Sequence, residues 1–245
     1  MAQNSLVQKN ADKPTEYECN GLTVKITPNI IRKYFVSGDG NITEEECVMF
    51  LNLCKYQRLN PYLREAHCIK YGTSPATMVT GKEVYTKRAM RNPTYAGQQA
   101  GVIVQYADGT TKDRIGALVL KNEQLVGAWA KVYVRNYEVP IEISVGLDEY
   151  IGLKKDGTVN QQWSKKPATM IRKVALVQAL REAFPEDMQG LYSAEEFGVD
   201  EETLNQQPIE NPDKIFAEAV ETKEKPVEKT ADYTGKHLDD DPFGN

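Results

Sequence analysis

Basic side chains gather near the middle of the chain in a pattern that suits phosphate binding. Lys82, Lys87, Arg88 and Arg91 lie within one short segment, and Tyr85 stands among them. A helix over this segment would carry cations along one flank with an aromatic ring beside them. Guanidinium groups bind phosphate oxygens in pairs and ammonium groups bind them as point charges, so the segment indicates contact with a polyanion.

A second group of cations lies in the run GAWAKVYVR. Lys131, Tyr133 and Arg135 would share one face of a strand there, because successive strand side chains point to opposite faces. Tyrosine beside lysine and arginine on one face is a composition that can stack bases and hold phosphates.

A third group flanks the most apolar helix that the sequence predicts, over residues 167–184. On a continuous helix Lys165 lies above Arg172, and Lys166 lies above Lys173, since each pair is seven residues apart. The residues that we expect to contact nucleic acid are therefore Lys82, Tyr85, Lys87, Arg88, Arg91, Lys131, Arg135, Trp163, Lys165, Lys166, Arg172 and Lys173.

Each of these residues also has a simpler interpretation. A single lysine or arginine is more often a solvated surface residue, and a tyrosine or tryptophan in a sheet is more often part of the core. Only the clustering favours nucleic-acid binding. A non-catalytic assembly module that binds an acidic protein would show the same basic surface and stays an alternative.

Catalytic and metal-binding motifs are not recognisable in the sequence. It has no P-loop and no G-x-G-x-x-G, and His67 and His237 are its only histidines. The run SGDGNITEEE resembles a calcium loop but begins without an acidic ligand, so a glycine turn before a helix explains it better. The four cysteines form no C-x-x-C pair, which leaves reduced thiols. No cofactor is therefore expected, and the protein is not expected to be an enzyme.

A metal-dependent nuclease is the alternative from another class. A basic body could bind DNA in order to cut it, and Glu65, Glu45-Glu46 and Asp148-Glu149 supply carboxylates. These carboxylates do not form a cluster at strand ends with a lysine nearby, so nucleic-acid binding without cleavage is preferred.

The net charge of −5 conceals a strong asymmetry along the chain. Residues 186–245 contain 17 Asp and Glu against 5 Lys and Arg, a net charge of −12. Residues 1–185 contain 18 Asp and Glu against 25 Lys and Arg, a net charge of +7. A basic body followed by an acidic tail suits a protein that binds a polyanion, although a solvated tail without a role gives the same composition.

The N-terminal part of the body is predicted to be helical. Residues 28–36 suit a short helix with Pro28 at its first position. A second helix starts at Thr43, where Glu46 completes a capping box, and it should end before Asn60-Pro61. Its buried face would hold Cys47, Phe50, Leu51 and Cys54.

The sequence pattern of residues 66–145 is typical of a small antiparallel sheet. Short runs rich in β-branched and aromatic residues alternate with turn signals, and one helix over residues 81–91 interrupts them. A short helix and a loop are expected over residues 147–163. The predicted strands are residues 66–71, 76–80, 100–106, 114–120, 127–134 and 139–145.

These elements indicate an α+β fold, a small and mostly antiparallel sheet with flanking helices. We expect an N-terminal arm over residues 1–25, one core domain over residues 26–198 and a disordered acidic tail over residues 199–245. The sequence has no apolar run of membrane-spanning length and no signal peptide at its N-terminus, so a cytoplasmic location is expected.

Several of these segments resemble the phage recombination protein Bet family, the single-strand annealing proteins related to Redβ and RecT. The resemblance runs in order over residues 28–196. It rests on LNPYLREAHCIKYG, ATMVTGKEVYTKRAMRNPTYAG, GAWAKVYV and DEYIG, and above all on WSKKPATMIRKVALVQALREAFPEDMQGLYSAEE.

The resemblance implies a protein that coats single-stranded DNA and anneals it to a complementary strand, without ATP, in phage or prophage recombination. It also implies a ring or helical filament of subunits and a basic groove in an α+β core. Its implied partners are single-stranded and annealed duplex DNA, a 5′–3′ exonuclease and the host single-stranded-DNA-binding protein, in the cytoplasm of a bacterial host.

Two segments match the family closely enough to carry over residues. The W-x-x-x-P-x-x-M-x-R pattern places Trp163, Pro167, Met170 and Arg172 in the block whose cations hold the DNA backbone. The pattern G-K-x-x-[FWY]-x-K-R corresponds to residues 81–88. After the proline the chain has Ala168 and Thr169 where relatives carry a basic pair.

The last residues, HLDDDPFGN, are similar to the acidic tip of bacterial single-stranded-DNA-binding proteins. Two residues follow the phenylalanine here, and a chance match within an acidic tail is the simpler interpretation.

Overall fold

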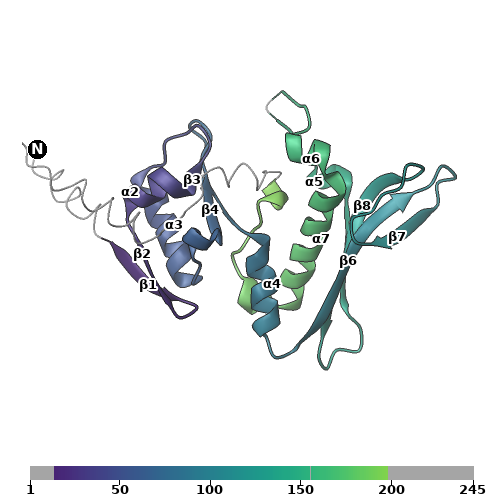
Figure 1. Ribbon diagram of the computed structural model, residues 1–245, viewed down its shortest axis with the longest axis horizontal. Helices are drawn as coiled ribbons and strands as arrows, with labels where there is room; N and C mark the ends of the chain where they lie inside the picture. Colours follow the sequence, from purple (N-terminus) through teal and green to yellow (C-terminus); the bar gives the residue numbers. More distant parts are fainter. Residues whose placement is uncertain (1–13, 155, 198–245) are drawn as a thin grey trace, which may run out of the picture.

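The elements form two groups along the long axis of the molecule (Figure 1). One group contains β1 to β5 with α2 and α3, and the other contains α4, α7 and the sheet β6 to β9. The computed structural model describes residues 14–154 and 156–197. It confirms the α+β class, with small and mostly antiparallel sheets flanked by helices. The expected tail over residues 199–245 lies outside the described residues.

The chain enters the fold through a β-hairpin. β1 (Thr15–Cys19) pairs antiparallel with β2 (Leu22–Ile26), and Asn20 and Gly21 join them with φ angles of 53° and 80°. Both angles are positive, as a two-residue type I′ turn requires. The prediction of a loose arm through residue 25 is therefore wrong for this segment. Asn-Gly between two alternating runs was the signal for the hairpin, and its inner side chains are buried.

The predicted N-terminal helices are confirmed, with one difference. α2 (Pro28–Ile30) is only the first turn of the segment, and a π-helical turn, η1 (Ile31–Phe35), continues it. α3 (Glu44–Tyr56) has the capping box that the sequence predicts, with the Thr43 N–H donating to Glu46 Oε2 at 2.9 Å. The four residues expected on its inner face are buried.

A three-stranded sheet packs beside these helices. β3 (Val36–Ser37) pairs parallel with β4 (Ala66–Ile69), which pairs antiparallel with β5 (Thr77–Thr80); the 3₁₀ turn η2 (Pro61–Leu63) precedes β4. Lys70, directly after β4, donates from Nζ to Glu46 Oε1 at 2.7 Å, and the Ala76 N–H donates to the same oxygen. This ion pair joins the sheet to α3 and is almost entirely shielded from solvent.

The larger sheet has the strand order β7-β6-β8-β9 and is antiparallel throughout. Its strands are β6 (Tyr95–Gln105), β7 (Thr111–Ile115), β8 (Gln124–Val134) and β9 (Ile141–Gly146). The strand predicted over residues 114–120 ends at Ile115, because Gly116 takes a φ of +83° and turns the chain out of the ladder. The strands thus form three sheets where we expected a single one.

α7 (Pro167–Ala183) lies between this sheet and α4 (Lys82–Arg91) (Figure 1). Its buried side chains cover most of its circumference, and they pack against inward residues of β6 and β8 such as Val102 and Ala130. The short elements around it are α5 (Leu147–Tyr150), α6 (Gln161–Lys165), α8 (Pro185–Met188) and η3 (Glu195–Phe197). In the described part of the chain, no helix combines the length and apolarity needed to cross a membrane.

The Glu46–Lys70 pair makes the stability of the group of elements from β1 to β5, which we call the N-terminal group of elements, depend on pH. The ammonium of Lys70, with the N–H groups of Thr43 and Ala76, lowers the pKa of Glu46 to about 2. The unfolded value is about 4.3, so the stabilisation is complete above that pH and is lost as the pH falls toward 2. Glu46→Gln leaves the Lys70 charge buried without its partner and should cost about 3 kcal/mol of unfolding free energy at pH 7.

Chemical denaturation of both proteins between pH 2 and pH 7 measures this contribution. The difference between wild type and variant should shrink as the pH falls from about 4.3 to 2. Glu44→Gln is the matched control, because Glu44 lies on the same helix as Glu46 and forms an exposed pair with Arg32 of η1. This substitution should cost no more than about 1 kcal/mol. An equal effect of the two substitutions, constant with pH, would contradict the assignment.

Candidate nucleic-acid interface

Two of the aromatic residues that were expected to contact bases lie in the core. Tyr85 is fully buried and its hydroxyl oxygen accepts a hydrogen bond from Thr80 Oγ1 at 2.9 Å; burial raises its pKa. Trp163 is 1% exposed and packs in the same core. In this conformation neither ring offers a face to a base, so for these two residues the structure favours the alternative of a core role.

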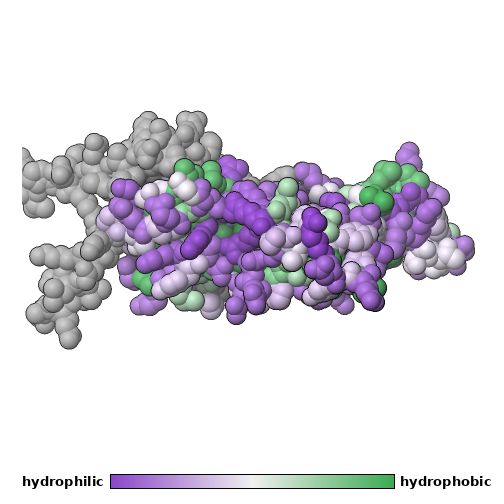
Figure 2. Space-filling view, turned by 90° about the horizontal axis from the view of Figure 1, so that it is seen from below, coloured by the Kyte–Doolittle hydropathy of each residue, from purple (hydrophilic) through white to green (hydrophobic). Residues whose placement is uncertain are grey.

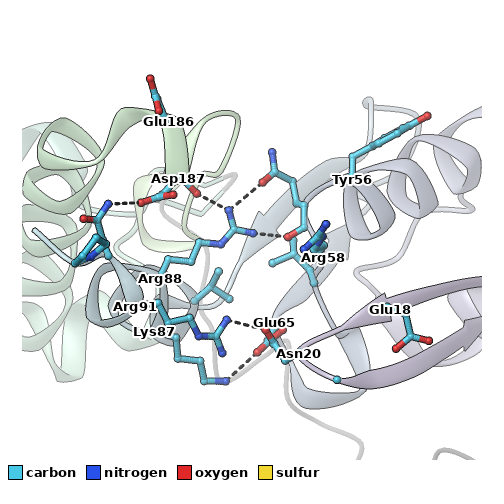
Figure 3. Close-up of a pocket in the computed structure, with 16 residues that line it drawn as sticks. Glu18, Asn20, Tyr56, Arg58, Glu65, Lys87, Arg88, Arg91, Glu186 and Asp187 are labelled. Carbon is cyan, nitrogen blue, oxygen red and sulfur yellow. Dashed lines mark hydrogen bonds and ion pairs between the residues drawn. The ribbon is translucent and has the colours of Figure 1, made fainter. Parts of the chain in front are cut away.

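Three cations of α4, Lys87, Arg88 and Arg91, line a cleft of about 620 Å³ (Figure 3). The turn of the β1–β2 hairpin and the end of α3 form one wall, and α4 with α8 forms the other. The charged residues that line it are Arg58, Lys87, Arg88 and Arg91 together with Glu18, Glu65, Glu186 and Asp187. Because the two signs are equal in number, the cleft carries no net positive charge.

Three side chains of α4 reach across this cleft to the N-terminal group of elements (Figure 3). Lys87 Nζ lies 2.9 Å from Glu65 Oε1, and Arg91 donates to Asn20 Oδ1 at 2.7 Å. Arg88 donates to both the side-chain and main-chain oxygens of Gln57 and to the main-chain oxygen of Asp187. Burial of its guanidinium lowers the pKa of Arg88. Arg88 therefore connects the end of α3, α4 and α8.

The cations of β8 face the other way. Lys131 and Tyr133 lie on the outer face of the large sheet, since the alternate residues Ala130 and Val132 are buried toward α7. Lys131 pairs with Glu142 on β9 at 3.1 Å and lies over the ring of Trp129, while Arg135 is exposed in the turn after the strand. α4 and α7 separate this outer face from the cleft (Figure 1).

The third predicted group surrounds the junction of α6 and α7. Lys165 ends α6, and Lys166 takes φ −136° and ψ 47°, so the helix is interrupted before Pro167. The two rows that a continuous helix would have formed therefore do not exist, and this part of the prediction is wrong. Both lysines are exposed at the N-terminal end of α7. Lys173, further along, pairs with the buried carboxylate of Glu195 at 2.9 Å.

Arg172 is held in a distinctive way. Its Nε donates to the main-chain oxygen of Ala100 in β6 at 3.1 Å, and the side chain is only partly buried. Its two terminal nitrogens have no partner among the described residues. A guanidinium that is fixed through Nε presents the remaining N–H groups in a set direction, which is the geometry that binds a phosphate through two hydrogen bonds.

The predicted residues are thus distributed over three places. Lys87, Arg88 and Arg91 meet in the cleft; Lys131 and Arg135 lie on the outer side of the sheet. Lys165, Lys166, Arg172 and Lys173 belong to the α6–α7 junction, and Lys82 begins α4 with a partly exposed side chain. α4 and α7 pack against each other, and both helices run in the same direction (Figure 1). The N-terminal end of α4, where Lys82 lies, is therefore on the same side of the pair as the N-terminal end of α7, which Lys165 and Lys166 precede.

One cation that lines the cleft and one that precedes α6 were not predicted. Arg58 lines the cleft with a φ of 49°, a conformation set by how α3 ends, which the sequence does not reveal. Lys154 is exposed just before α6, in a turn that the Lys154 N–H closes by donating to the main-chain oxygen of Thr158. The run Lys-Lys-Asp-Gly at residues 154–157 is a turn signal that carries two cations, and it could have identified Lys154.

Within residues 14–154 and 156–197, no group of three or more His, Cys, Asp or Glu side chains could hold a metal ion. The four cysteines are free and buried, and burial raises the pKa of the Cys68 thiol to about 12. Thiols of this kind stay protonated and unreactive at neutral pH.

Comparison with known proteins gives a family for this chain. The model of the RecT family matches residues 23–209. A protein of Ureaplasma parvum serovar 3, described as the uncharacterized protein UU154, is 29% identical over 136 residues, which are 56% of this chain and 52% of that protein. The chain therefore spans about half the length of the curated relative that it matches.

The hydrogen bonds of Arg88 predict a contribution to stability. Arg88→Ala removes charge-assisted bonds from three oxygens in a partly buried setting and should lower the unfolding free energy by about 1.5–3 kcal/mol. Arg91→Ala, one turn later with a single exposed bond, is the control and should cost about 0.5–1 kcal/mol. Urea denaturation gives both values, and a loss for Arg88→Ala no larger than that of the control would contradict this role.

Proposed function

Because the chain belongs to the RecT family of recombination proteins, we propose that it binds single-stranded DNA and anneals it to a complementary strand without a nucleotide cofactor. It does so in phage or prophage recombination, in the cytoplasm of a bacterial host. Annealing breaks no covalent bond, so the protein needs a surface that holds a strand and no catalytic residues. The RecT family also implies self-association.

The anchored guanidinium of Arg172 is the observation that supports a particular DNA-binding surface. The surface that we propose comprises Arg172, Lys165 and Lys166, with Lys173 next to Arg172 in the chain, and we call it the α7 basic surface. Arg172 is fixed on β6, whereas Lys165 has no partner among the described residues. Cations of this kind remain available to phosphates, in contrast to those of the cleft, where Arg88 is engaged by three protein oxygens.

The physical task explains why cations suffice. One strand must be held extended with its base edges open while the repulsion of a second strand is reduced. Contacts to phosphates achieve both without reading sequence, because pairing with the second strand tests complementarity. Binding should then release counterions and weaken steeply with salt. Free DNA ends would come from a partner 5′–3′ exonuclease, and the host single-stranded-DNA-binding protein would compete for the same strand.

Replacement of Arg172 tests the proposed surface. Arg172→Gln should weaken binding of a single-stranded oligonucleotide about tenfold, which is about 1.4 kcal/mol. It should also lower the slope of log K against log salt by about one unit, as the loss of one phosphate contact predicts. Lys55→Gln removes one exposed charge from the last turn of α3 and is the matched control, with both quantities unchanged.

Annealing of two complementary oligonucleotides, followed by fluorescence without nucleotide, measures the activity itself. Wild type should form full-length duplex, and Arg172→Gln should do so more slowly at equal protein concentration while its melting temperature stays close to that of wild type. Magnesium-dependent shortening of the strands would instead identify a nuclease. Wild-type annealing by Arg172→Gln would remove Arg172 from the proposed surface.

A further inference from the structure

Apolar side chains are exposed at several places on the described part of the chain, and two of these places lie far apart. Figure 2 shows one apolar area at the free end of the large sheet and another on the half of the molecule that holds α3. Contiguous apolar surface on a water-soluble fold marks an interaction site more often than chance exposure does. The residues that carry each area come from different elements and are considered in turn.

Exposed apolar side chains lie at the end of β7 and in the loop that follows it. Ile115, Leu118 and Leu120 expose 74%, 60% and 41% of their surface within six residues. At Gly116, which has a φ of +83°, the chain turns away from the sheet. The ion pair between Arg114 and the fully shielded Glu123 joins the two ends of the loop. The loop is thus held in place while its apolar side chains face solvent. We call these three residues the β7–β8 loop patch.

The outward face of α3 also exposes apolar side chains. The face opposite the buried cysteines presents Val48, Met49 and Tyr56, which are 46%, 61% and 78% exposed, with Asn52 between them. Met49, Asn52 and Tyr56 are three, four and seven residues apart and Val48 lies four residues before Asn52, which places all four on one stripe of the helix. An outward helix face is usually charged, so this stripe is an unpartnered apolar face. We call it the α3 stripe.

We infer that the β7–β8 loop patch of one subunit binds the α3 stripe of the next subunit. This inference rests on the self-association included in the proposed function, and it specifies which surfaces meet. The two surfaces are on different groups of elements, toward opposite ends of the molecule (Figure 1). One subunit can therefore use both surfaces at once. A pair of subunits joined by one contact still has one free loop patch and one free α3 stripe.

The charges beside the two surfaces support this pairing. Lys121 adjoins Leu120, Lys112 lies on the edge strand β7, and both are exposed. The first turn of α3, one turn before Met49, carries Glu44 and Glu45, of which Glu45 is exposed. Opposite charges around an apolar contact favour one partner surface and one orientation. Asp113 beside the patch and Lys55 beside the stripe are exposed as well, so each surface has a surplus of one sign: two lysines against one aspartate beside the patch, and two glutamates against one lysine beside the stripe.

Contact between two different surfaces is heterologous, so repetition generates a ring or an open helical filament. Such an array places the α7 basic surface of every subunit in the same orientation along one DNA strand. The inference thus links an apolar contact at the ends of the subunit to a continuous strand-binding surface.

The test uses one charged substitution in each surface of the full-length chain. Met49→Asp disables the α3 stripe and Leu118→Asp disables the β7–β8 loop patch; both positions are exposed, so the fold should tolerate them. Leu63→Asp is the matched control, because Leu63 is 55% exposed and belongs to neither surface. Sedimentation velocity with and without a long oligo-dT strand reports assembly, and circular dichroism reports folding.

The result expected is specific to a heterologous contact. Wild type and Leu63→Asp form multimers, each of the two surface variants is monomeric, and their equimolar mixture forms a 1:1 dimer that grows no further. Multimers of either surface variant, a mixture that stays monomeric, or a wild type that stays monomeric even on oligo-dT would overturn the inference. Affinity for an oligonucleotide too short to bind two subunits tests the proposed DNA binding separately, and it should be unchanged in both variants.

Discussion

The packing of α7 between the large sheet and α4 is the constraint on which the rest of the molecule depends. Residues such as Ile171, Val174 and Leu180 are fully buried, so the helix cannot shift without opening the core. A buried helix can expose only a few positions, and in the first two turns of α7 these are Pro167, Ala168, Thr169, Arg172 and Lys173. The rigid packing therefore fixes where the guanidinium of Arg172 and the lysines just before the helix lie, which is what a phosphate-binding surface requires.

The same constraint divides the cations of the protein into groups with different tasks. Those on the inner side of α4 hold the two groups of elements together across a cleft in which positive and negative charges balance. Those on the outer face of the sheet are partly neutralised by Glu142. Near the beginning of α7, Arg172 projects its terminal nitrogens from a rigid support, so the surface that we propose uses only part of the basic charge of the sequence.

Local signals in the sequence predicted much of the fold. The capping box of Thr43 and Glu46, the β-branched runs and the apolar helix after Pro167 each depend on neighbours in the chain, and the structure contains all of them. The site was less predictable because it depends on contacts between distant residues. Tyr85 is buried by the core that α4 helps to form, Arg88 binds Gln57 and Asp187, and Lys166 interrupts a helix that looks continuous in sequence. The Asn20-Gly21 hairpin was missed although its signal is local.

A map of the protein assembled on a homopolymeric DNA strand tests the central claim most directly. The account predicts that phosphates of the bound strand lie within hydrogen-bond distance of the terminal nitrogens of Arg172, with Lys165 and Lys166 beside the same stretch of backbone. A strand that runs instead through the cleft of Arg88, or along the outer face of β8 past Lys131, with the α7 basic surface facing solvent, would contradict it.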